Sequence, residues 1–126
     1  MAAYTLENLQ VYQRSLAAAA AISALTDAAG FRRELELRSQ LRDASGRIPA
    51  HIAEGHGQKT DRHFAHFLYT ARATAKEIRA RLAVALGRGC ISEADRKAND
   101  ETYDEIARML TGLIRHLEAE DRKFRP

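Results

Sequence analysis

Apolar residues recur at steps of three and four positions through several long stretches of this 126-residue sequence. This spacing places apolar side chains along one face of an α-helix. The longest such series is Phe64, Phe67, Leu68, Ala71, Ala75, Ile78, Leu82, Ala85 and Leu86. β-branched residues never alternate with polar ones over the length of a strand, and only two prolines and seven glycines interrupt the chain. We therefore expect an all-α protein with long helices.

Four helices are expected, and short polar or glycine-containing segments separate them. They cover residues 6–28, 33–54, 61–86 and 93–122. At about 1.5 Å per residue each helix is roughly 30–40 Å long, and short connections between long helices favour antiparallel neighbours. The length of the chain suits one continuous core. We expect residues 1–126 to form a single domain, an antiparallel up-and-down four-helix bundle.

Residues with strong capping preferences mark the expected helix ends. Thr5 and Thr60 are suitable N-caps for the first and third helices. Ser92 and Asp95 form a variant of the capping box at the start of the fourth. Gly30 follows the first helix, at a position where a left-handed residue commonly ends a helix.

Pro49 falls inside the second helix, where a proline lacks the N–H donor and crowds the preceding turn. With Gly46 nearby, we expect the second helix to be kinked at this point.

The end of the second helix carries three further residues with expected structural roles, Glu54, Gly55 and Gly57. Gly55 is expected to adopt a positive φ where the helix ends, and Gly57 to continue the turn. Glu54 lies in the last turn, where its charge opposes the helix dipole, so it needs a cationic partner. Arg42, Arg47 or a neighbouring chain could supply one.

The first helix is apolar around most of its circumference. Between Leu16 and Ala29 the polar residues are Ser23, Thr26 and Asp27. One apolar stripe is enough for a helix in a monomeric bundle, so a second buried face at a subunit interface is expected. A merely alanine-coated surface is the alternative. The candidate interface residues are Leu16, Ala19, Ala20, Ile22 and Ala28.

The net charge of +3 is unevenly distributed. Residues 59–89 carry seven Lys/Arg and two Asp/Glu, whereas residues 90–126 carry seven and nine. The candidate nucleic-acid-binding stripe on the third helix comprises Arg62, Tyr69, Arg72, Lys76, Arg79, Arg81 and Arg88. Such a stripe can attract phosphates, with the tyrosine available for stacking. Alternatively, the acidic fourth helix neutralises part of the stripe or sets subunit orientation. Its acids are Asp100, Glu101, Asp104 and Glu105.

Histidines gather around the second turn, where a zinc or nickel site is conceivable. The cluster is His51, Glu54, His56, His63 and His66. The alternative is that they are solvated or hydrogen-bonding turn residues, and on this interpretation no metal is bound. A di-iron site is excluded because no histidine has an acidic residue three positions before it.

No other pattern indicates catalysis. The turn at 55–60 follows a helix rather than a strand and lacks the glycine that precedes the lysine of a phosphate loop. There is no triad spacing and no dinucleotide fingerprint. We expect no enzyme activity, no cofactor and no small-molecule substrate.

Cys90 is the single cysteine, so no disulfide can form within the chain, and we expect it to be a small buried residue rather than a reactive thiol. The longest apolar run, 16–22, is too short to span a bilayer, and no secretory signal pattern is present. A cytoplasmic protein without membrane contact is expected.

Several short stretches carry a family resemblance. The most specific is IPAHIAEGHG at 48–57, joined by LQVYQ at 9–13, SQLR at 39–42, FAHFL at 64–68 and RMLTGLIR at 108–115. From about residue 6 to 117 the sequence resembles the four-helix bundle protein family, also called the 23S rRNA intervening-sequence protein family. It differs from the family pattern at His51, where asparagine is usual, and at Gly30-Phe31, where Phe-Pro is common.

The resemblance implies a homo-oligomer in the form of a ring-like pentamer, as in the related accessory proteins of diversity-generating retroelements. Those relatives are similar to basic nucleic-acid and reverse-transcriptase binders. The main hypothesis is therefore a non-enzymatic homo-oligomeric scaffold that is a candidate for RNA or DNA binding. The alternatives are a protein-interaction module without nucleic-acid affinity and, more remotely, a small metal-dependent enzyme at the histidine-rich turn.

Overall fold

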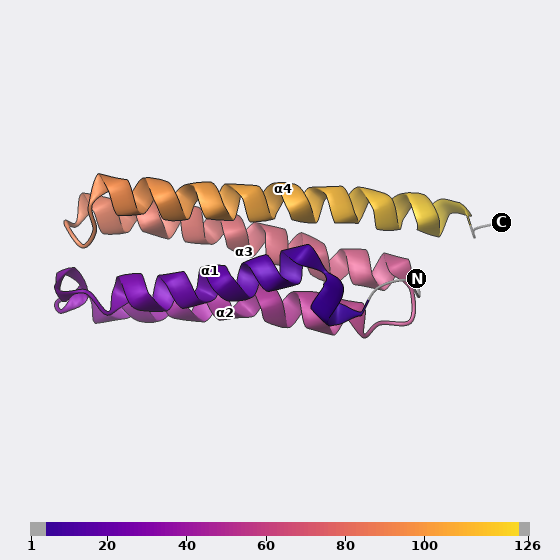
Figure 1. Cartoon of the computed structure of the whole chain (residues 1–126), viewed down its shortest axis with the longest axis horizontal. Coiled ribbons are helices and arrows are strands. Elements are labelled where there is room, and N and C mark those ends of the chain that lie inside the picture. Colours follow the sequence, from indigo (N-terminus) through magenta and orange to yellow (C-terminus); the bar gives the residue numbers. More distant parts are fainter. Residues whose placement is uncertain (1–4, 124–126) are drawn as a thin grey trace.

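Four long helices make up most of residues 5–123, the part of the chain that this computed structural model describes (Figure 1). They are α1 (Gln10–Thr26), α2 (Leu35–His56), α3 (Asp61–Gly87) and α4 (Glu93–Lys123). Two single-turn 3₁₀ helices, η1 (Leu6–Asn8) and η2 (Ala29–Phe31), flank α1. Residues 5–123 contain no strand, so the all-α class and the number of long helices are confirmed.

The boundaries agree with the expected ones to within two residues for α2, α3 and α4. The first expected helix, 6–28, is instead divided. Leu9 has an extended backbone (φ −74°, ψ 114°) between η1 and α1. Thr5 precedes η1 but its side chain makes no capping hydrogen bond. Leu9 is buried and the half-buried Leu6 packs against the core, so the apolar pattern alone gave no signal of this break.

Two of the expected N-caps are present. The Thr60 hydroxyl accepts a hydrogen bond from the backbone N–H of His63 at 3.1 Å. The Ser92 hydroxyl accepts one from the N–H of Asp95, also at 3.1 Å. Each satisfies one of the backbone donors that a helix leaves unpaired in its first turn.

The end of α3 is closed by a Schellman motif. Gly89 adopts a left-handed conformation (φ 77°), and among the described residues it alone has a positive φ. The N–H of Cys90 donates to the carbonyl of Ala85 at 2.9 Å, and the N–H of Gly89 donates to that of Leu86 at 3.0 Å. Cys90, only 6% exposed, thereby joins the core.

Gly30 and Gly55 do not have the expected left-handed conformation, and both are required for a different reason. A Cβ on Gly30 would lie 2.1 Å from the carbonyl oxygen of Cys90, so the α1–α2 and α3–α4 connections meet backbone to backbone. Gly55 lies within α2, where a Cβ would come within 2.8 Å of Phe64 Cδ1 and Phe67 Cβ. Both glycines therefore permit close approach between segments that are distant in sequence or separated by a turn.

Pro49 is buried inside α2, and the helix continues without interruption from Leu35 to His56. Gly57 follows as its C-cap with an ordinary negative φ of −78°. The proline therefore removes one backbone donor without ending the helix.

Side chains from all four helices form one shared apolar core. Its largest fully buried members are Tyr103, Phe31, Ile22, Leu41, Ile48, Ile52, Leu68, Ile78, Leu82, Ile106, Leu110 and Ile114. Contacts between α3 and α4 follow one another in reverse order along the two helices. Successive contacts join Tyr69 to Glu118, Arg72 to Thr111, and Arg79 to Asp100.

α1 contributes less to this core than its composition indicates. Ile22 is fully buried within the chain, so we exclude it from the candidate interface. Leu16 is 41% exposed, Ala20 and Ala28 are exposed, and Ala19 is half-buried. α1 thus has an apolar inner face and a second apolar face at the surface.

No helix in the described part of the chain combines the length and the apolar character that crossing a bilayer requires.

Candidate nucleic-acid interface

The seven residues of the expected stripe point in different directions from α3. Arg62, Tyr69 and Lys76, spaced by seven residues, are all exposed. Arg72 and Arg79 are half-buried against α4, and Arg81 is half-buried against α2. Arg88 is exposed in the connection to α4. The residues of the stripe therefore fall into four sets with different neighbours.

Arg79 is held by two carboxylates of α4. Its guanidinium donates to both oxygens of Asp100, at 2.9 and 3.3 Å, and to Asp104 at 3.2 Å. The hydrogen bond to Asp100 raises the pKa of Arg79. Arg88 in the same way donates to Glu34 at 3.1 Å. The positive charge of both arginines is thus balanced within the chain, as the alternative interpretation of the acidic fourth helix requires for Arg79.

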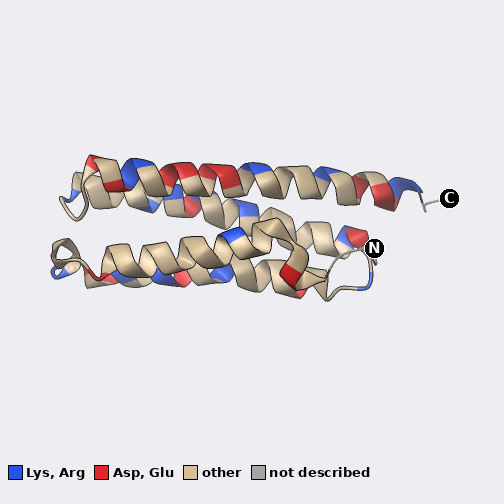
Figure 2. Cartoon of the chain, viewed as in Figure 1, with Lys and Arg blue, Asp and Glu red and all other residues tan. Residues whose placement is uncertain are grey.

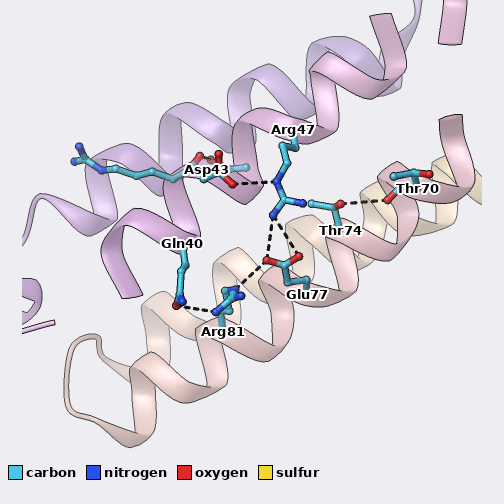
Figure 3. Close-up of polar contacts among 9 residues, drawn as sticks. Gln40, Asp43, Arg47, Thr70, Thr74, Glu77 and Arg81 are labelled. Carbon is cyan, nitrogen blue, oxygen red and sulfur yellow. Dashed lines mark hydrogen bonds and ion pairs between the residues drawn. The ribbon is translucent and has the colours of Figure 1, made fainter. Parts of the chain in front are cut away.

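Arg81 belongs to a polar network between α2 and α3 (Figure 3). It donates to Glu77 at 2.9 Å and to Gln40 at 2.7 Å. Arg47 of α2 donates to both oxygens of Glu77, at 3.2 and 3.3 Å, and to Asp43 at 3.1 Å. Burial opposes ionisation of Glu77, but the two arginines together lower its pKa. Arg81 therefore links two helices and is not available to a phosphate.

Tyr69 and Arg72 form a fixed pair beside α4. The Arg72 guanidinium carbon lies 4.9 Å from the centroid of the Tyr69 ring, and its Nη1 donates to Thr111 at 3.1 Å. The Tyr69 hydroxyl donates to Glu118 at 3.0 Å. This hydrogen bond to Glu118 raises the pKa of Tyr69. Since Tyr69 is 41% exposed, its ring remains accessible for stacking.

Three arginines of α4 extend the positive surface, and the sequence interpretation did not include them. Arg108, Arg115 and Arg122 are exposed and spaced by seven residues. Each lies one helical turn after a residue of α4 that contacts α3, namely Asp104, Thr111 and Glu118. They therefore follow the edge of α4 that borders α3. The seven-residue spacing of the arginines was the sequence signal that could have identified them.

The two helices together define a surface that we call the α3/α4 basic surface. It consists of Arg62, Lys76, Arg108, Arg115 and Arg122. Among residues 5–123, the only ion pair of this set joins Arg108 to Asp104 at 3.4 Å. Most acids of α4 lie in its first half, as Figure 2 shows, and three more, Glu118, Glu120 and Asp121, lie between Arg115 and Arg122. Arg62 at the start of α3, Lys76 near its middle, and Arg115 and Arg122 in the second half of α4 therefore have no ion pair within residues 5–123.

Glu54 is exposed, and among residues 5–123 its one hydrogen bond is through the backbone carbonyl, which accepts from Gln58, with no ion pair to its carboxylate. Of the two arginines considered as partners, Arg42 pairs with Asp27 at 2.6 Å, and Arg47 pairs with Asp43 and Glu77. Neither supplies the expected intrachain partner. A carboxylate that opposes its helix dipole is therefore left to solvent or to another molecule.

The histidines of the second turn lie against aromatic rings. His51 and His66 both contact Phe67, at 6.4 and 5.9 Å between ring centroids, and His56 packs edge-on against Phe64 at 5.9 Å. In the described part of the chain, three or more His, Cys, Asp or Glu side chains nowhere come together in a way that could hold a metal ion.

Burial raises the pKa of the Cys90 thiol, and the neighbouring Glu34 carboxylate adds to this effect.

Comparison with known proteins supports a family assignment. None of the curated proteins compared with the chain matches it. One protein family, described as 23S rRNA-intervening sequence protein, matches residues 7–112. This segment contains α1, α2 and α3 and most of α4, which is well over half of the 126 residues. The chain belongs to the 23S rRNA-intervening sequence protein family.

Proposed function

We propose that the chain is an antiparallel up-and-down four-helix bundle that assembles into a homo-oligomer, a pentamer, and serves as a non-enzymatic cytoplasmic scaffold. It binds RNA or DNA across the α3/α4 basic surface. The observation that carries this proposal is the double row of exposed cations on two adjacent helices. The reversed order of the α3–α4 contacts supports the antiparallel topology. The lone cysteine suits a reducing compartment.

The spacing of the cations suits a phosphate backbone. A seven-residue step along a helix advances about 10.5 Å, and packed helices lie about 8–10 Å apart. The arginines of α4 are therefore about 10.5 Å apart, whereas Arg62 and Lys76 of α3 are about 21 Å apart with Tyr69 between them. Charges spaced in this way can track phosphates without reading bases. In a closed oligomer this surface is repeated once in every subunit, so weak individual contacts add through avidity.

Two surface features support self-association. The outer face of α1 exposes Leu16 and Ala20 together with neighbouring alanines, and such a face is favourably buried against another copy. The Glu54 carboxylate also has no ion pair among the described residues of its own chain. An opposite charge from a neighbouring subunit would complete its environment.

Nucleic-acid binding is tested by fluorescence anisotropy with a labelled single-stranded oligonucleotide at about 50 and 200 mM salt. Replacing Lys76→Glu and Arg115→Glu together should weaken binding at least about tenfold and reduce the salt slope. The control, Arg32→Glu with Arg33→Glu, changes the net charge equally at exposed positions before α2, outside the α3/α4 basic surface. An equal loss in both variants would show that total charge, and not this surface, determines binding.

A protein-interaction module without nucleic-acid affinity is the second candidate. The observation that favours it is the pairing of Arg79, Arg81 and Arg88 with carboxylates of the same chain. Those contacts use three of the cations on which the α3 stripe depended. Failure of the wild-type protein to bind any oligonucleotide at low salt would decide for this candidate.

Self-association is tested by light scattering. The wild type should have a mass several times the chain mass of 14.1 kDa. Ala20→Glu on the outer face of α1 should reduce it, whereas Ala94→Glu at the exposed start of α4 should not. A wild-type mass equal to that of one chain would contradict the homo-oligomer.

A further inference from the structure

A cleft of about 310 Å³ lies between the start of α3 and the end of α4, at one end of the α3/α4 basic surface. Arg62, His66 and Tyr69 line it from α3, and Glu118, Asp121 and Arg122 line it from α4. Its two arginines and two carboxylates balance, so charge alone does not select its ligand. The volume is at the lower end of the range for small-molecule sites, roughly 300–1,000 Å³, and suits one nucleotide rather than a duplex.

Tyr69 provides a flat and fixed wall for this cleft. The cleft residues of α3 all precede or include Tyr69, and those of α4 begin at Glu118. Arg72 lies one turn further along α3, beside Thr111, and stacks on the ring from that side. The opposite ring face is therefore directed toward the cleft. A base stacked there would complete a sandwich of guanidinium, phenol ring and base.

Glu118 provides a fixed acceptor at the edge of this wall. Its Oε2 accepts the hydrogen bond from the Tyr69 hydroxyl at 3.0 Å, which orients the carboxylate. A carboxylate has about four lone-pair positions, so further donors can be accepted. Two adjacent N–H donors suit it best, because its two oxygens can accept them side by side.

Guanine alone among the common bases presents two adjacent donors, N1–H and the N2 amino group, on its Watson–Crick edge. Adenine and cytosine place a ring-nitrogen acceptor beside their amino group, and uracil and thymine flank their single N3–H with carbonyl oxygens. Each of these acceptors would repel the carboxylate of Glu118. The Watson–Crick edge of guanine is accessible to a protein side chain only where the base is unpaired.

We propose that this cleft binds an unpaired guanine of a single-stranded nucleic acid. The base stacks on Tyr69, its N1–H and N2 amino groups donate to Glu118, and Arg62 and Arg122 contact the flanking phosphates. This inference rests on the nucleic-acid binding proposed above and adds a base preference to it.

The test uses labelled oligouridylates of about eight nucleotides with one central guanine, hypoxanthine, adenine or cytosine, and the deoxy equivalents. For the wild type, the guanine strand should bind about tenfold more tightly than the adenine strand. Hypoxanthine, which lacks the N2 amino group, should fall between them. No contact to the 2′-hydroxyl is invoked, so the preference should hold in RNA and in DNA.

Variants separate the base preference from binding in general. Glu118→Gln should bring the guanine-to-adenine ratio close to one while the affinity for plain oligouridylate stays within about threefold. Glu101→Gln, the same change at an exposed position of α4 outside the cleft, should leave the ratio as in the wild type. Tyr69→Ala should weaken binding of every strand through lost stacking.

Each outcome has a distinct meaning. Binding by the wild type without preference for guanine overturns the inference and leaves the proposed nucleic-acid binding intact. A preference that survives Glu118→Gln overturns the assignment of Glu118. Absence of binding to every strand overturns both proposals.

Discussion

Two glycines of α2 should respond in opposite ways to the same substitution. A Cβ at Gly46 meets no heavy atom within 4 Å, whereas a Cβ at Gly55 would lie 2.8 Å from both Phe64 Cδ1 and Phe67 Cβ. Both residues lie inside the same helix. Gly46→Ala and Gly55→Ala therefore change helix propensity alike and differ in the space that the new methyl group meets.

The magnitudes follow from two opposing effects. Alanine is more favourable than glycine inside a helix by about 1 kcal/mol at either position. Forcing a methyl group into a filled space costs about 1–3 kcal/mol. The cost at Gly55 should be in the upper half of that range, because the Cβ of Phe67 is fixed to its backbone and cannot rotate away. Gly46→Ala should thus stabilise by about 1 kcal/mol and Gly55→Ala destabilise by about 1–2 kcal/mol.

Denaturant unfolding followed by circular dichroism measures both changes, at two protein concentrations so that any contribution of self-association is visible. Gly112→Ala on α4 is a second control, since a Cβ there also meets nothing within 4 Å. The expected separation between the two α2 variants is about 2–3 kcal/mol. A Gly55→Ala protein as stable as the wild type would refute the reasoning, because the spacing of α2 and α3 would then not depend on the missing side chain.

Three further predictions concern single groups. Thr60→Ala should lower the unfolding free energy by about 1 kcal/mol, measured in the same denaturant assay, because the cap of α3 is lost. Arg81 and Arg47 hold the pKa of Glu77 below its usual 4.5, so its ion pairs stabilise the fold above about pH 4.5 and lose effect as the pH falls through the lowered pKa. As the pH is lowered, the free energy of unfolding should therefore decrease less in Glu77→Gln than in the wild type. Identical curves of unfolding free energy against pH would contradict this. Cys90, buried and with a raised pKa, should react with a thiol reagent only when the protein is unfolded, and rapid reaction in the native state would contradict its placement.

The basic surface shows how far the sequence could identify the candidate site. The sequence placed Arg62, Tyr69 and Lys76 on one face of α3, because a seven-residue spacing nearly completes two helical turns. The sequence could not show that Arg79 is neutralised by Asp100 whereas Lys76 has no ion pair among residues 5–123, since both belong to the same expected stripe. The cleft beside Tyr69 could not be predicted from the sequence either, because its opposite wall includes Glu118, which belongs to another helix.

The sequence by itself determined the four long helices and two of their N-caps. Those features depend on contacts between residues three or four positions apart, as at Thr60 and Ser92, and a linear pattern records such contacts directly. Only the tertiary structure decided the role of Gly30, which meets the backbone of Cys90. It also decided which charged side chains form ion pairs between helices. These depend on which helix faces are brought together, and that is set by the packing of the whole core rather than by any local spacing.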